Sequence, residues 1–324
     1  MLYKQLLENY IHPFIIYVLI GTLISYILCR ILVRVRIFRS AKWRAMVYSI
    51  PFVVPFAAYF LRKPLLLNRC FVFGDHPIAS TSWVCTGGSV LAAILTPLLM
   101  ASVVYAVFRA VLSFAACRKF IKTYGYADRA EHLRLFLILE SLCAKAEVRM
   151  PRVVVTTNRF ARAFTMGFRY QVIVLSHGLI KNLDDDELET VLAHELGHIV
   201  RNDSLTNSII VFLRDIMFFT PLIFYVFRDY SSEKEKATDD YAIQLTGKPM
   251  AFAQALIKVW KMSPGSRIEN AVPFPAFVSH AGILDQRVER LVQGDFCVLG
   301  NRLSSPLAFS ILVMISMALL YYLC

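Results

Sequence analysis

Charged residues are scarce in this chain of 324 residues, where 18% of the side chains are charged and 57% are hydrophobic. A soluble globular domain usually carries about 25% charged residues. The sequence also lacks an internal repeat, a low-complexity stretch and any C-x-x-C pair among its seven cysteines. These absences exclude a disordered or fibrous protein, argue against a simple soluble enzyme, and leave a thiolate zinc site without support.

Long apolar runs predict transmembrane helices. A span needs about 20 apolar residues, and four runs without a charged residue approach or exceed that length: 13–29, 45–61, 90–108 and 303–324. A fifth run, 208–227, contains Arg214 and Asp215 and is interrupted by Pro221. Because ionised groups are costly in hydrocarbon, we expect a bent, partly membrane-embedded segment there, with the two charges paired or reaching the interface.

The distribution of basic residues predicts the orientation. The net charge is +12, and the loop between the first two runs holds six basic residues and no acidic one, which favours the cytoplasm. We expect residues 1–112 to be a membrane region with three helices, 113–302 a cytoplasmic domain, and 303–324 a last transmembrane helix. This arrangement predicts a multi-pass protein of the cell membrane. In a bacterium, that membrane would be the inner or plasma membrane. Its partner is the lipid bilayer, and the basic residues carry no nucleic-acid pattern.

Two cysteines fall on the predicted outer side. Cys70 and Cys85 could form a disulfide there or remain free thiols, and the sequence leaves both alternatives open.

The cytoplasmic region mixes helices and strands. Residues 127–147 predict an amphipathic helix, and 153–157 and 171–175 predict short strands with 163–170 as a hairpin partner between them. Asp184 and Glu187 form a capping box for a helix that we expect to run to Val200.

That helix carries a metal-binding pattern. His194 and His198 lie four residues apart and share one helix face, so two imidazoles can bind one ion, and Glu195 between them can reach a metal-bound water. Zinc lowers the pKa of such a water and the glutamate takes its proton. The alternative is a surface helix with two solvated histidines.

A third ligand is expected downstream. On a helix, Glu235 and Asp239 share a face, so Glu235 can bind the metal while Asp239 accepts a hydrogen bond from a ligand histidine. Glu233 has Ala237 at the same spacing and lacks that support, which favours Glu235. The alternative for this cluster is a solvated charged helix.

Residues 175–203 resemble the membrane gluzincin metalloproteases, in which the motif around the paired histidines extends to Asp203. A second, later motif of that family matches Glu235 and Asp239. One branch comprises HtpX-type heat-shock proteases and CAAX prenyl proteases, and the other comprises β-lactam sensor-transducer antirepressor proteases. The element 219–222 and the order of spans resemble the antirepressor branch, although that branch continues into an extracellular sensing domain. Residues 279–290 resemble the HtpX branch, with Ala281 in place of its proline.

The resemblance implies an α-helical integral membrane protein with an α+β zincin-like domain and one zinc ion per chain. Glu195 would act as general base, and Asp203 as a supporting rather than a ligating residue. His280 or Arg287 would stabilise the oxyanion, the alternative being that His280 caps a helix and Arg287 pairs with a carboxylate. An edge strand would hold the substrate extended; it comprises Ala163, Phe164, Thr165, Met166 and Gly167.

These observations predict an integral membrane zinc endopeptidase. Its substrate would be a cytosolic repressor or membrane-anchored regulator, cut as a signal, or damaged membrane proteins, cut for quality control. A separate sensor or regulator protein is a possible partner. The alternatives are a non-catalytic signalling scaffold that keeps the protease fold, and a transporter, for which only Arg214 and Asp215 offer intramembrane charge.

Overall fold

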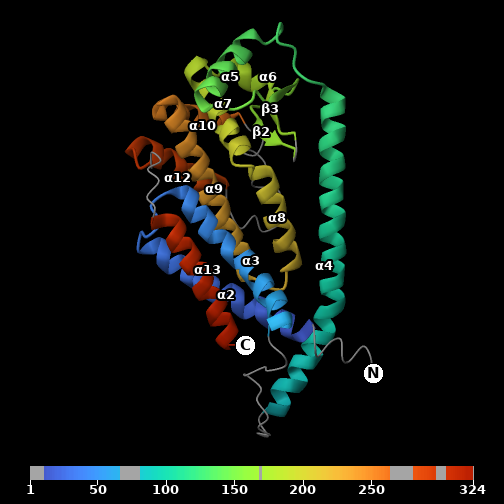
Figure 1. Cartoon of the computed structure of the whole chain (residues 1–324). Helices are drawn as coiled ribbons and strands as arrows, with labels where there is room; N and C mark the ends of the chain where they lie inside the picture. Colours follow the sequence, from blue (N-terminus) through green and yellow to red (C-terminus); the bar gives the residue numbers. More distant parts are fainter. Residues whose placement is uncertain (1–10, 66–80, 168–169, 263–279, 297–303, 324) are drawn as a thin grey trace.

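The structure is a computed structural model that describes residues 11–65, 81–167, 170–262, 280–296 and 304–323. It combines a bundle of long helices with a smaller region of helices and one three-stranded sheet at the end of the bundle (Figure 1). The side chains of Cys70 and Cys85 lie outside the described residues, so the question of their disulfide stays open.

All four apolar runs are helical over the residues that the structure describes. They lie in α2 (His12–Arg34), α3 (Ala41–Leu65), α4 (Thr81–Tyr124) and α13 (Ser304–Leu323). Among the described residues, two stretches are long and apolar enough to cross a membrane, Tyr17–Arg34 and Ile94–Tyr124, and α13 contributes the shorter apolar stretch Pro306–Leu320. Four crossings therefore remain a prediction.

Helix α4 continues well past the apolar run that predicted it. It spans 44 residues with Pro97 inside and does not end at Arg109, where the charged residues begin. Its C-terminal end reaches the sheet (Figure 1), and the ring of Phe120 lies 6.2 Å from the ring of Phe164 on strand β2. One continuous helix thus connects the bundle to the sheet.

The predicted strands form a mixed sheet. Strand β3 (Val172–Ser176) lies between β1 (Arg152–Thr156), to which it is parallel, and β2 (Ala163–Met166), to which it is antiparallel. The hairpin turns at Gly167, whose φ of +103° and close approach to the Tyr170 carbonyl oxygen leave no room for a side chain. The strand order places β2 at the edge of the sheet, as the family resemblance implied.

The helix expected over 127–147 was predicted too long. Helix α5 covers Leu133–Ala146, because the Asp128 carboxylate accepts the Ala130 N–H and the Ala127 N–H bonds to the Val153 carbonyl, which gives the backbone a turn instead.

The capping box is confirmed. Asp184 accepts the Glu187 N–H and Glu187 accepts the Asp184 N–H, and α7 then runs over Asp185–Val200 after the short helix α6 (His177–Asn182). Buried leucines at helical spacing fix α7 in the core; they are Leu188, Leu192 and Leu196.

The segment 208–227 is bent, as expected. Helix α8 (Asp203–Ile216) ends before Pro221, and α9 (Leu222–Thr246) begins after it. Helix α9 lies along α3 (Figure 1), and α10 (Pro249–Lys261) and α12 (His280–Gln293) complete the described helices.

Part of the basic loop is bound to α9. Arg30, near the end of α2, pairs with Asp229 at 3.0 Å, and Arg44, in the first turn of α3, pairs with Glu233 at 2.6 Å. These two arginines, which the sequence analysis treated only as membrane anchors, therefore also link α9 to α2 and α3, which pack on it through an apolar cluster.

Candidate metal centre and active site

The site forms where α7 crosses α9. The crossing is close because Gly197 has no side chain: a Cβ there would lie 2.9 Å from Thr238 Cγ2 and 3.0 Å from Tyr241 Cδ1. This contact brings the two histidines of α7 opposite Glu235 of α9.

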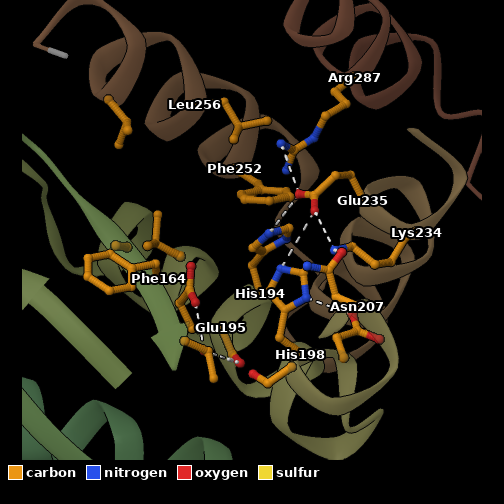
Figure 2. Close-up of a pocket in the computed structure, with 16 residues that line it drawn as sticks. Phe164, His194, Glu195, His198, Asn207, Lys234, Glu235, Phe252, Leu256 and Arg287 are labelled. Carbon is orange, nitrogen blue, oxygen red and sulfur yellow. Dashed lines mark hydrogen bonds and ion pairs between the residues drawn. The ribbon is translucent and has the colours of Figure 1, made fainter. Parts of the chain in front are cut away.

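Three donors converge at the crossing (Figure 2). One nitrogen each of His194 and His198 and one carboxylate oxygen of Glu235 all lie within 4.8 Å of one another. The His194 Nε2–Glu235 Oε2 distance is 3.6 Å and the His198 Nε2–Glu235 Oε1 distance is 4.0 Å. Two ligand atoms of a tetrahedral zinc ion, each bound at about 2.0–2.2 Å, lie roughly 3.3 Å apart. The donor set and its spacing therefore fit a zinc ion after a small closure.

The other ring nitrogens face aspartates. His198 Nδ1 lies 2.7 Å from Asp203 Oδ2. His194 Nδ1 lies 3.1 Å from Asp239 Oδ1, without the alignment of a hydrogen bond. An Nδ1 proton shared with a carboxylate leaves Nε2 as the metal-binding nitrogen. Both Nε2 atoms face Glu235, and for His198 the hydrogen bond to Asp203 leaves that nitrogen free to bind a metal.

Without a metal, the charged forms of His194, Glu235 and Asp239 stabilise one another. Desolvation opposes the charged form of His194, but Asp239 and Glu235 outweigh it and raise the pKa of His194 to about 9. Desolvation also opposes ionisation of Glu235, yet His194 and the charge of Arg287 hold its pKa well below the usual range. The site thus carries a proton that a metal ion would displace.

Arg287 pairs with a carboxylate. Its guanidinium donates two hydrogen bonds to Asp239, at 2.8 and 2.6 Å, and its Nη1 lies 3.5 Å from Glu235. Of the two alternatives that the sequence left open for this arginine, the structure contains the carboxylate pair. Its role toward an oxyanion remains a prediction. His280 is the first residue of α12, and its side chain lies outside the described residues.

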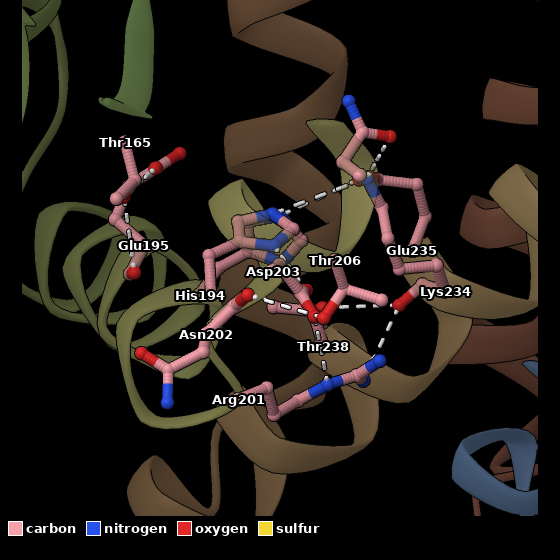
Figure 3. A network of polar contacts seen from close by, with 12 residues as sticks. Thr165, His194, Glu195, Arg201, Asn202, Asp203, Thr206, Lys234, Glu235 and Thr238 are labelled. Atoms are coloured by element: carbon pink, nitrogen blue, oxygen red, sulfur yellow. Dashed lines mark hydrogen bonds and ion pairs between the residues drawn. The ribbon is translucent and has the colours of Figure 1, made fainter. Parts of the chain in front are cut away.

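Glu195 is held by the edge strand. Thr165 Oγ1 on β2 donates to Glu195 Oε2 at 2.8 Å (Figure 3). Strand β2 also borders the cavity, of about 390 Å³, through Ala163 and Phe164. Met166 instead packs on the small cluster of β1 and β3, and Gly167 forms the turn, so three of the five predicted substrate residues line the cavity.

The remaining walls of the cavity differ in polarity. Phe252, Leu256 and Val259 of α10 form an apolar wall with Val191, and the Phe252 ring lies 5.5 Å from the His194 ring. A polar wall lies on α8 and α9; it comprises Ser204, Asn207 and Lys234. The sequence analysis missed both walls. The i, i+4, i+7 spacing on α10 indicated an apolar helix face but not what it covers.

Glu233 points elsewhere. Its carboxylate is bound by Arg44 and by Lys236, at 3.0 Å, so it is not among the donors that converge with the histidines.

Comparison with known proteins places the chain in a family. The model of the family described as BlaR1 peptidase M56 matches residues 66–291. A protease HtpX homolog of Acidiphilium cryptum is 30% identical over 52% of this chain and 74% of its own length. Those of Bacteroides fragilis and Acaryochloris marina are 25% and 29% identical over 61% and 56% of their own lengths, so the chain spans about three fifths of these relatives. The chain belongs to the BlaR1 peptidase M56 family of membrane metalloproteases.

Proposed function

We propose that the chain is an integral membrane zinc-dependent endopeptidase that hydrolyses peptide bonds of a cytosolic or membrane-associated protein. The convergence of His194, His198 and Glu235 beside Glu195 carries this proposal, because two imidazoles, a third ligand and an adjacent carboxylate are what a hydrolytic zinc site needs.

The same three residues would hold the ion. When bound, zinc supplies a Lewis acid for the scissile carbonyl and lowers the pKa of a coordinated water. Glu195 accepts the proton of the attacking water and returns it to the leaving amine. The free edge of β2 binds the substrate backbone as an added strand, so the substrate enters as an extended segment.

The ion pairs of the basic loop support a cytoplasmic site. Arg30 and Arg44 contact Asp229 and Glu233 of α9, the helix that also carries Glu235. The basic loop and the metal site therefore share one side of the bundle. Since a loop of basic residues favours the cytoplasm, the site faces it as well.

Regulatory cleavage and quality control both fit this geometry, because the cavity has an apolar and a polar wall that select residue types rather than one protein. The alternative is a membrane scaffold that signals without cutting. A metal site without activity would characterise that alternative.

Zinc content and proteolysis measured on one preparation test the proposal. We would purify the full chain in detergent as wild type, Glu195→Gln and Glu189→Gln. Glu189 is the matched control, because it lies on the same helix but pairs with Lys145 and Lys248 away from the cavity.

We expect about one zinc per chain in all three proteins, and casein cleavage in the wild type and the control only. Zinc without cleavage in the wild type would favour the scaffold. Absence of zinc after metal loading would contradict the metal site itself.

A further inference from the structure

Helices α4 and α8 share an ion cluster that the catalytic site does not use. The Asp215 carboxylate, whose side chain is 9% exposed, is bound by Arg109 of α4 and by its neighbour Arg214. Two guanidinium groups share one carboxylate, so the cluster carries one net positive charge.

Arg109 and Arg214 have N–H donors that Asp215 does not use. Among the residues that the structure describes, Arg109 donates one hydrogen bond and Arg214 two, all to Asp215. The Arg214 guanidinium also lies over the Phe227 ring, 4.6 Å from its centre. A guanidinium offers several further N–H donors, and because the Arg109 side chain is 39% exposed, its donors are accessible to a ligand.

An apolar cavity of about 330 Å³ adjoins the cluster. Ala101 and Tyr105 lie on the same face of α4 as Arg109, at successive intervals of four residues. Phe218 and Phe224 border the cavity from the other side. Helices α4 and α8 lie side by side along this region (Figure 1).

The position along α4 relates this cavity to the bilayer. Ala101 and Tyr105 belong to the uncharged run 90–108, and Arg109 is the first charged residue after it. With the run 90–108 across the bilayer, as the sequence predicts, the cavity would lie at the level of the lipid chains and Arg109 at the level of the headgroups.

We propose that this site binds one anionic phospholipid, with its phosphate on Arg109 and Arg214 and an acyl chain in the adjoining cavity. Guanidinium groups bind phosphate through paired, charge-assisted hydrogen bonds, and basic pockets between membrane helices bind acidic headgroups. The apolar lining selects a lipid over a free phosphate ion, which has nothing to place there.

Native mass spectrometry of the full chain in detergent tests the proposal, using phosphatidylglycerol, phosphatidylcholine and inorganic phosphate as probes. The variants are Arg109→Gln, Arg214→Gln and Ser102→Phe, which fills the cavity and keeps both arginines. Arg118→Gln is the matched control, since Arg118 also lies on α4 over an aromatic ring, that of Phe114, but away from the cavity.

We expect phosphatidylglycerol to bind in preference to phosphatidylcholine, and its affinity to fall about fivefold for each arginine removed. Ser102→Phe should also weaken it, and the control and excess inorganic phosphate should not. Equal binding of both lipids, unchanged binding in Ser102→Phe, or displacement by phosphate alone would overturn the proposal. If an arginine variant fails to fold, the affinity of Ser102→Phe for phosphatidylglycerol decides between the outcomes.

Discussion

The Thr165 hydroxyl donates a 2.8 Å hydrogen bond to the carboxylate of Glu195. The contact joins the strand expected to bind substrate to the residue expected to accept a proton. Thr165 Oγ1 also lies 3.2 Å from the Glu195 carbonyl oxygen, but its one proton makes the shorter bond to the carboxylate, whose direction it sets.

Replacing this hydroxyl should slow the chemical step. We expect Thr165→Val to lower kcat about 10- to 100-fold, because a hydrogen bond to a charged group contributes about 1.5–3 kcal/mol. KM should change little, and Thr165→Ser should restore kcat, which steady-state kinetics on a peptide would measure. A raised KM with unchanged kcat would mean that the hydroxyl serves the substrate strand instead.

Removing the charge behind His198 should weaken metal binding. Asp203 lies 2.7 Å from His198 Nδ1, and loss of such a partner typically costs about 10- to 100-fold in metal affinity. We expect this loss for Asp203→Asn in a zinc competition titration. The control is Asp240→Asn, a buried aspartate that pairs with Arg290. Equal affinities for both variants would argue against the supporting role.

The metal-free protein should lose stability in mild alkali. The pKa of His194 is about 9 in the fold against an ordinary value of 6.5. The folded state therefore holds an extra proton between these values, and its contribution is complete below pH 6.5 and lost as pH rises through 9. We expect the Tm in EDTA to fall by several degrees over this range. The zinc-loaded protein should lack this slope, because its imidazole no longer titrates.

Widening the helix crossing should disturb fold and site together. A Cβ at position 197 would lie 2.9 Å from Thr238 Cγ2, and such overpacking typically costs about 1–3 kcal/mol. We expect Gly197→Ala to lower both the Tm and the zinc affinity. Adding Thr238→Ser removes the opposing methyl and should recover part of both losses. An unchanged Tm and zinc affinity in Gly197→Ala would show that the two helices can separate at the crossing without cost.

The parts of the site that follow local rules were predictable. The capping box depends on residues three apart, the paired histidines on residues four apart, and the preference for Glu235 over Glu233 on the carboxylate at i+4. The apolar runs likewise predicted the helices of the bundle, since their length alone carries that information.

The parts that depend on packing between distant segments were not predictable. Nothing in the sequence near Arg287 states that its partner is Asp239, 48 positions away. The continuation of α4 past Arg109 is another case, because the charge ends an apolar run without ending a helix. Phe252 reaches His194 only through the placement of α10.

The ion pairs of Arg30 and Arg44 with α9 have a consequence for the order in which the protein is assembled. The ribosome makes the first two helices early, then the histidines, then α9 with Glu235, and Arg287 last of all. We expect a nascent chain to complete its metal site only after the N-terminal hairpin is in place to receive α9. Synthesis order would then delay the metal site until the bundle is assembled. A fragment starting at residue 113 should mature poorly, as its zinc content would reveal.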